Sequence, residues 1–182
     1  TNDNAKTAMY VFTGDAYRGM NPREFSQEDV VNAQGYLRIL SGLYGVLKPQ
    51  DIIQPYRLEM GAKLEYTKKV SNLYKFWGDK VTDALNSEME KEEVLINLAS
   101  NEYFKVIDPK KLNHRIVTCS FKDEKNGEYK IISFFAKFAR GLMTRFIIQN
   151  KITEVEHLKA FDLDRYCYNE EMSTADNFVF VR

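Results

Sequence analysis

Five long cations are spread along the chain beside small or glycine-bearing backbone, a setting that suits the binding of phosphate groups. Arginine and lysine neutralise a phosphate, and backbone N–H groups at a glycine turn donate further hydrogen bonds to it. Tyr44 and Tyr56 are interleaved with two of these cations, and their rings could stack on bases or sugars. The five cations are Lys48, Arg57, Lys137, Arg140 and Arg145.

The segment from Leu40 to Gly61 matches neither helix nor strand periodicity. Gly42 and Gly45 permit a close backbone approach, and the two prolines of the segment disfavour helix. One interpretation is a functional loop whose Gly42–Gly45 amides point at a phosphate, as the turn of a helix-hairpin-helix element does. The other is a structural crossover in which Arg57 pairs with Glu59, and spacing alone favours that second interpretation.

Two carboxylates, Glu59 and Glu102, lie in the same irregular segments. They could act as general acid and base, or simply pair with Arg57 and Arg140. Ser41 and Tyr103 would complete an acid–base site if the fold brought these groups together. Ser100 and Asn101 follow the apolar run Val94–Leu98, where an N-cap role for either residue is the stronger reading.

Several classes of site find no support in the residue types. His114 and His157 are the only histidines, and neither has a second metal ligand at helical spacing, so no metal site is expected. No nucleotide-binding or hydrolase fingerprint occurs, and no cofactor is expected. Cys119 falls on the apolar side of a predicted strand and should be an inert core residue, and with Cys167 it suits a reducing compartment. No apolar run reaches the length of a membrane span.

Charge is unevenly distributed along the 182 residues, although the formal net charge is zero. Residues 101–151 carry eleven basic and five acidic side chains, a net charge of +6, and the remainder carries −6. This segregation indicates an anionic partner for one surface.

Periodicity and turn signals predict the elements that must position these groups. We expect a short strand over Ala8–Phe12 and helices near Gln27–Leu40 and Leu73–Met89. Ser26 with Asp29 should cap the first helix, and Asn72 should cap the second. We expect further strands at Val94–Leu98, Arg165–Tyr168 and Phe178–Val181, a short helix at Thr153–Lys159, and a hairpin over Arg115–Ile132 with its turn at Asn126-Gly127.

Ser133 should cap a long helix that ends near Asn150. Its predicted apolar face includes Phe135, while Lys137 and Arg140 fall on another face. Ala136 and Gly141 beside those cations are small, so that a bulky partner could approach closely. The mixed order of elements predicts a single α+β domain over residues 1–182, with a central sheet, a β-hairpin and a helix-hairpin-helix-like element.

Five blocks of the sequence, in order, resemble the YaaA family of bacterial peroxide-stress-response proteins. The shorter GDAYRG (Gly14–Gly19) and the terminal VFVR fit as well, so that the resemblance covers essentially the whole chain. The five blocks are LSGLYGVLKPQD (Leu40–Asp51), PYRLEMG (Pro55–Gly61), NLYKFW (Asn72–Trp77), INLASNEYF (Ile96–Phe104) and AKFARGLMTRFI (Ala136–Ile147).

The resemblance implies a cytoplasmic protein that limits iron-driven oxidative damage and binds duplex or branched DNA in a positively charged cleft. It implies no established catalysis. An uncharacterised enzyme acting on a nucleobase, a nucleoside or damaged DNA in the same cleft is the alternative. Family members carry a further N-terminal stretch with a Ser-Pro-Ala-Lys motif, which is absent here.

Overall fold

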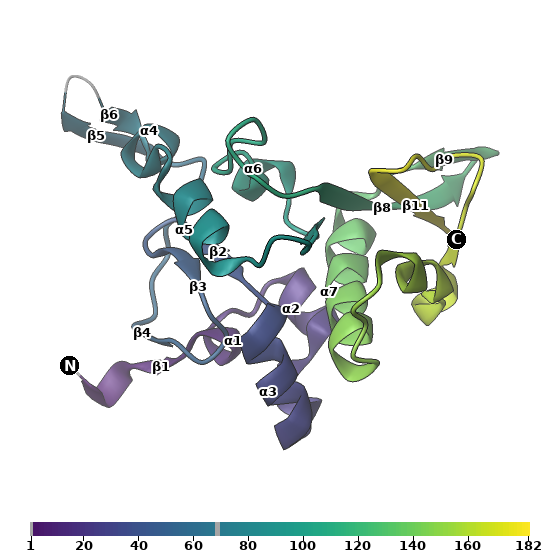
Figure 1. Cartoon of the computed structure of the whole chain (residues 1–182), viewed down its shortest axis with the longest axis horizontal. Helices are drawn as coiled ribbons and strands as arrows, with labels where there is room; N and C mark the ends of the chain where they lie inside the picture. Colours follow the sequence, from purple (N-terminus) through teal and green to yellow (C-terminus); the bar gives the residue numbers. More distant parts are fainter. Residues whose placement is uncertain (1, 68–69) are drawn as a thin grey trace. The chain divides into compact units, whose positions relative to one another are not determined.

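The computed structural model describes residues 2–67 and 70–182 (Figure 1). The internal contacts of the chain divide it into two compact units. Unit 1 comprises Thr1–Val11, Leu37–Glu93 and Ala99–Arg115, and unit 2 comprises Phe12–Tyr36, Val94–Leu98 and Ile116–Arg182. The chain is α+β with a mixed central sheet, as predicted. Among the described residues, no helix is both long enough and apolar enough to cross a lipid bilayer.

Unit 2 contains the central sheet, whose strand order is β10-β11-β8-β7, with β9 paired to β8. The β11–β8 and β8–β7 pairs are parallel, while β10–β11 and β8–β9 are antiparallel. Its elements are α2 (Asp15–Met20), η2 (Pro22–Glu24), α3 (Gln27–Tyr36), β7 (Leu95–Asn97), β8 (Ile116–Lys125), β9 (Glu128–Lys130), α7 (Ser133–Gln149), η3 (Val155–Ala160), η4 (Leu163–Arg165), β10 (Cys167–Tyr168) and β11 (Asn177–Val181).

The predicted hairpin is confirmed in β8 and β9. Asn126 and Gly127 both have positive φ, 58° and 79°, which a two-residue hairpin turn requires. Burial along β8 alternates from Val117 through Cys119 to Phe121, so that one face of the sheet packs into the core. Aromatic rings fill much of that core, among them Phe121, Phe161, Tyr166, Phe178 and Phe180.

Helix α7 packs against α2, and Figure 1 shows the two side by side. The contact depends on glycine, because a Cβ at Gly141 would lie 1.8 Å from the Ala16 carbonyl oxygen and one at Gly19 would lie 2.2 Å from the Phe138 carbonyl oxygen. The expectation that Ala136 and Gly141 leave room for a bulky partner is therefore wrong. Both are buried, and α2 occupies the space beside Gly141.

Unit 1 consists of short elements joined by ordered loops. Among its described residues, the strands pair as three two-stranded sheets, β1–β4, β2–β3 and β5–β6. The elements are η1 (Asn2–Asn4), β1 (Lys6–Thr7), α1 (Ala8–Val11), β2 (Ile39–Ser41), β3 (Gly45–Leu47), β4 (Ile52–Ile53), β5 (Lys63–Thr67), β6 (Val70–Asn72), α4 (Leu73–Trp77), α5 (Lys80–Glu88) and α6 (Asn101–Phe104).

Three predictions about these elements need correction. Ala8–Val11 is helical, not a strand. The helix expected from Leu73 to Met89 is broken at Gly78, whose φ is +52°, into α4 and α5. The Gly42–Gly45 turn joins two antiparallel strands, so a helix-hairpin-helix-like element is not found at this place.

Two predicted helix caps are confirmed. The Asp29 amide donates to Ser26 Oγ at 3.1 Å and the Ser26 amide donates to Asp29 Oδ2 at 2.9 Å, a reciprocal capping box. Asn72 accepts from the Lys75 amide at the start of α4. Helix α7 differs from the prediction, because its N-cap position is Ile132 and no side chain caps it.

Candidate nucleic-acid interface and acid–base cluster

Helix α7 presents the cations predicted for its polar face. Lys137 is exposed, and Arg140 lies one turn further along and is half-buried. Burial lowers the pKa of the Arg140 guanidinium. In the part of the chain that the structure describes, no carboxylate lies within ion-pair distance of either side chain. A half-buried cation with no ion-pair partner has lost part of its hydration, and no protein charge compensates for that loss. An anionic ligand would provide the missing compensation.

The other three predicted cations differ in their surroundings. Arg145 donates to Glu24 Oε2 at 2.8 Å, so its charge is already balanced. Lys48 lies 3.5 Å from Glu88, which also accepts from Arg38. Arg57 is exposed and forms no ion pair with Glu59 or with any other described carboxylate.

These five cations do not all belong to one unit. Lys137, Arg140 and Arg145 lie in unit 2, whereas Lys48 and Arg57 lie in unit 1. Their convergence on one groove stays a prediction.

Unit 1 brings the predicted acid–base residues together around two tyrosines. Ser41, at the end of β2, is fully buried, and its hydroxyl lies 2.5 Å from the Tyr56 hydroxyl. The Tyr44 amide donates to Ser41 Oγ, and the Tyr44 ring packs edge-on against the Tyr56 ring. Burial raises the pKa of Tyr56, and the hydrogen bonds from Ser41 and from the backbone of Leu43 and Gly42 oppose that rise.

The turn amides that we expected to face a phosphate are thus close to the Tyr56 hydroxyl. Gly42 and Gly45 are held in place by Trp77, whose Nε1–H donates to the Gly42 carbonyl at 3.0 Å. A Cβ at Gly45 would lie 2.9 Å from the Trp77 ring, and φ at this glycine is +77°. The turn therefore requires glycine at Gly45 for both space and conformation.

Tyr103 on α6 lies close to both predicted carboxylates. Burial raises its pKa, and the charges of Tyr56, Glu102 and Glu59 raise it further. Glu102 Oε1 accepts from the Gly61 amide at 2.8 Å, and a Cβ at Gly61 would meet this carboxylate. The alternative in which Glu59 pairs with Arg57 is not observed among the described residues. We call Ser41, Tyr56, Tyr103, Glu59 and Glu102 the tyrosine–carboxylate cluster.

Sequence reasoning assigned Tyr56 only a stacking role and did not foresee its hydroxyl contact with Ser41. The contact depends on the pairing of β2 with β3, which fixes Ser41 at the end of β2 within reach of the Tyr56 hydroxyl. Such short strands give little periodic signal in the sequence, so this pairing could not be predicted. The predicted Ser100 cap is confirmed, and its hydroxyl accepts from the Tyr103 amide at 3.4 Å. Asn97 is buried, and its amide donates to Thr118 Oγ1 at 3.3 Å.

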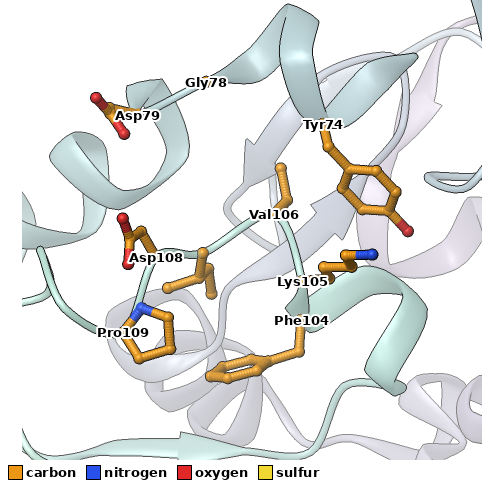
Figure 2. A pocket seen from close by; sticks show the side chains of 9 residues that line it. Tyr74, Gly78, Asp79, Phe104, Lys105, Val106, Asp108 and Pro109 are labelled. Atoms are coloured by element: carbon orange, nitrogen blue, oxygen red, sulfur yellow. The ribbon is translucent and has the colours of Figure 1, made fainter.

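A pocket of about 510 Å³ is lined by residues at the break between α4 and α5 and by the segment that runs from the end of α6 to Pro109 (Figure 2). Lys105 Nζ lies 5.3 Å from the centroid of the Tyr74 ring, and Asp79 and Asp108 lie at the opposite side of the pocket. Asp79 is paired with Lys111 at 2.6 Å, and Asp108 accepts from the Lys110 amide. These acids are thus engaged by neighbouring protein groups. Within the described residues, no group of three His, Cys, Asp or Glu side chains is placed to hold a metal ion.

Comparison with known proteins places the chain among peroxide-stress proteins. The family model described as "Peroxide stress protein YaaA" matches residues 1–172. A UPF0246 protein of Aliivibrio fischeri is 58% identical over 184 residues, covering 100% of this chain and 71% of the relative. Similar UPF0246 proteins of Colwellia psychrerythraea and Saccharophagus degradans are 57% and 54% identical, and the chain covers 71% and 72% of their lengths.

Proposed function

Because this chain belongs to the YaaA family of peroxide stress proteins, we propose that it binds duplex or branched DNA in the cytoplasm and thereby helps to limit iron-driven oxidative damage. The observation that supports DNA binding most is the state of Arg140 and Lys137 on α7. Both cations lack an ion-pair partner among the described residues, and burial makes Arg140 costly to keep charged without an anion.

The distribution of charge supports the same proposal. The stretch from Tyr129 to Arg145 contains four basic residues and no acidic residue. A polyanion gains affinity there by releasing counterions. Arg57 in unit 1 is a further exposed cation that phosphate could reach, while Lys48 and Arg145 already have acidic neighbours.

The test is DNA binding by fluorescence anisotropy across a series of salt concentrations. We expect the affinity of the wild type for a duplex to fall steeply with salt. The double variant Lys137→Ala/Arg140→Ala should bind more weakly to all sequences, with a log–log salt slope smaller by roughly one per lost phosphate contact.

A matched control removes the same charge from cations that are already paired. Lys151 is paired with Glu28, and Lys159 is paired with Glu156. The variant Lys151→Ala/Lys159→Ala should bind as the wild type does. Equal loss in both double variants would mean that net charge alone governs binding, and a flat salt dependence in the wild type would refute the proposal.

The tyrosine–carboxylate cluster favours a second candidate, catalysis on a nucleobase, a nucleoside or damaged DNA. Tyr103 is flanked by two carboxylates and a second phenol, and it could donate a proton to a ring nitrogen while Glu59 or Glu102 accepts one. Oligonucleotides with damaged bases should then release a modified or free base, detected by mass spectrometry. Tyr103→Phe should abolish this release and Tyr36→Phe, an exposed control, should not. Absence of any product with the wild type would exclude this candidate for those substrates.

A further inference from the structure

A strip of large apolar side chains remains exposed where β9 leads into α7. We call Tyr129, Ile131, Phe134 and Phe135 the aromatic strip, and their exposed fractions are 42%, 59%, 49% and 39%. Single exposed apolar residues need no explanation, but four within seven positions indicate an interaction surface. Phe135 was expected on the buried face of α7.

The packing of α7 explains why these rings stay outside. The helix directs Ala136, Ala139 and Met143 into the core of unit 2. Phe134 and Phe135 occupy its first turn and pack edge-on against each other, with ring centroids 5.6 Å apart. Neither ring belongs to the buried core cluster.

Guanidinium groups lie over both phenylalanine rings. The Arg18 guanidinium carbon is 5.7 Å from the centroid of Phe134, and that of Arg182 is 4.4 Å from the centroid of Phe135. Arginine planes and aromatic rings are the two surfaces on which proteins stack unpaired bases. Both guanidinium groups already pair with carboxylates, Arg18 with Asp15 at 3.0 Å and Arg182 with Asp123 and Asp164, so the rings themselves are the surfaces left for a base.

Charge complementarity identifies the class of partner. The first turn of α7 has no acidic residue, and Lys137 follows the two rings on the same helix. Lys130 is paired with Glu128, so Lys137 and Arg140 are the nearby cations of α7 with no ion-pair partner among the described residues. Single-stranded DNA offers phosphates to these two cations and base faces to the rings, whereas an uncharged apolar protein surface would leave both cations without a partner. A duplex hides its base faces in the stack, so that only unpaired bases can use the rings.

We propose that the aromatic strip stacks unpaired bases of DNA, at a single-stranded overhang or a branch point, while Lys137 and Arg140 hold the neighbouring phosphates. This inference rests on the proposed DNA binding and adds the part of the DNA that the protein recognises. It assigns Phe134 and Phe135 as the residues that distinguish unpaired from paired DNA.

The test compares three labelled DNAs, a blunt duplex, the same duplex with a single-stranded overhang, and the single strand alone. Phe134→Ala/Phe135→Ala should weaken binding to the single strand and to the overhang by about tenfold or more, and should change duplex binding by less than about twofold. Phe134→Leu/Phe135→Leu keeps apolar area without an aromatic face and should behave like the alanine variant. Val31→Ala/Tyr36→Ala, which removes exposed apolar side chains from α3, should bind all three DNAs as the wild type does.

Failure of the stacking role and failure of the proposed DNA binding give different results in this test. If the wild type binds duplex DNA and the phenylalanine variants bind overhang DNA as tightly as the wild type does, the stacking role alone is overturned. The stacking role would also be overturned if the leucine variant retained full affinity, or if the alanine variant changed the oligomeric state in sedimentation without changing DNA binding. A wild type that binds none of the three DNAs removes the proposed function together with the stacking role.

Discussion

Replacing Gly141 by alanine would place a methyl group in the contact between α7 and α2. The added Cβ would lie 1.8 Å from the Ala16 carbonyl oxygen, and ordinary contact begins at 3.4 Å, so the helices would have to separate locally by about 1.6 Å. Overpacking of this kind costs about 1–3 kcal/mol, and the upper part of that range applies because a backbone carbonyl cannot rotate away. Helix propensity returns up to about 1 kcal/mol. We expect a net loss of about 2 kcal/mol in the free energy of unfolding.

The assay is urea unfolding followed by far-UV circular dichroism, with thermal unfolding as a second measurement. A loss of about 2 kcal/mol should lower the melting temperature by about 4–8 °C for a chain of this size. Gly35→Ala is the matched control, because Gly35 lies in the last turn of α3 and a Cβ there would meet nothing within 4 Å. That variant should gain about 0.5 kcal/mol. A Gly141→Ala variant as stable as the wild type would mean that α2 and α7 do not approach each other this closely.

Three further predictions concern the cysteines, high pH and a buried ion pair. Burial raises the pKa of the Cys119 thiol to about 12, so dilute peroxide or iodoacetamide at pH 8 should modify the exposed Cys167 and leave Cys119 intact by mass spectrometry; native-state modification of Cys119 would contradict this. Burial raises the pKa of Tyr56, Tyr103 and Tyr166 above 10.0. The stability that these neutral phenols contribute is therefore complete below about pH 10 and is lost as the pH rises through their folded-state pKa values. A free energy of unfolding that stays constant between about pH 9 and 11 would contradict this prediction. Asp123→Asn should lower the free energy of unfolding by about 3 kcal/mol in urea, because Asp123 is 8% exposed and accepts from Arg182 at 2.5 Å and from Tyr166 at 3.1 Å. The control Glu128→Gln, in the exposed pair of Glu128 with Lys130, should change it by less than about 0.5 kcal/mol.

Local side-chain chemistry made parts of the fold predictable from sequence. The Ser26–Asp29 capping box, the Asn72 cap and the Asn126-Gly127 turn each depend on residues within three positions of one another. Strand β8 was also predictable, since its alternating burial follows directly from the alternating residue types. Such features need no knowledge of distant packing.

Features set by tertiary contacts were not predictable in the same way. Ala8–Val11 has apolar residues that suit a strand, yet it folds as helix α1 and buries Ala8 and Met9. Gly141 was interpreted as space for a ligand, although α2, more than a hundred residues earlier in the chain, fills it. The partnership of Arg145 with Glu24 has the same origin, because 121 positions separate the two residues.

In the candidate site too, residue types could be predicted from sequence, whereas contacts between distant residues could not. Four residues of the tyrosine–carboxylate cluster could be chosen from sequence because Ser41, Glu59, Glu102 and Tyr103 lie in irregular segments that neither helix nor strand periodicity explains. The role of Tyr56 could not, because it depends on how the β2–β3 turn sits against the Tyr56 hydroxyl. Cations could be selected by position, but the acidic neighbours of Lys48 and Arg145 come from distant parts of the chain and emerge only in the folded structure.

Trp77 is the only tryptophan in the chain, and its indole lies against Gly45 in unit 1. Its fluorescence should therefore act as an optical reporter for the β2–β3 turn and remain silent about unit 2, which has only phenylalanine and tyrosine rings. Far-UV circular dichroism follows the helices of both units, including the long α7. Melting curves recorded with both probes on one sample would superimpose if the units unfold as one cooperative block and would separate if one unit opens first.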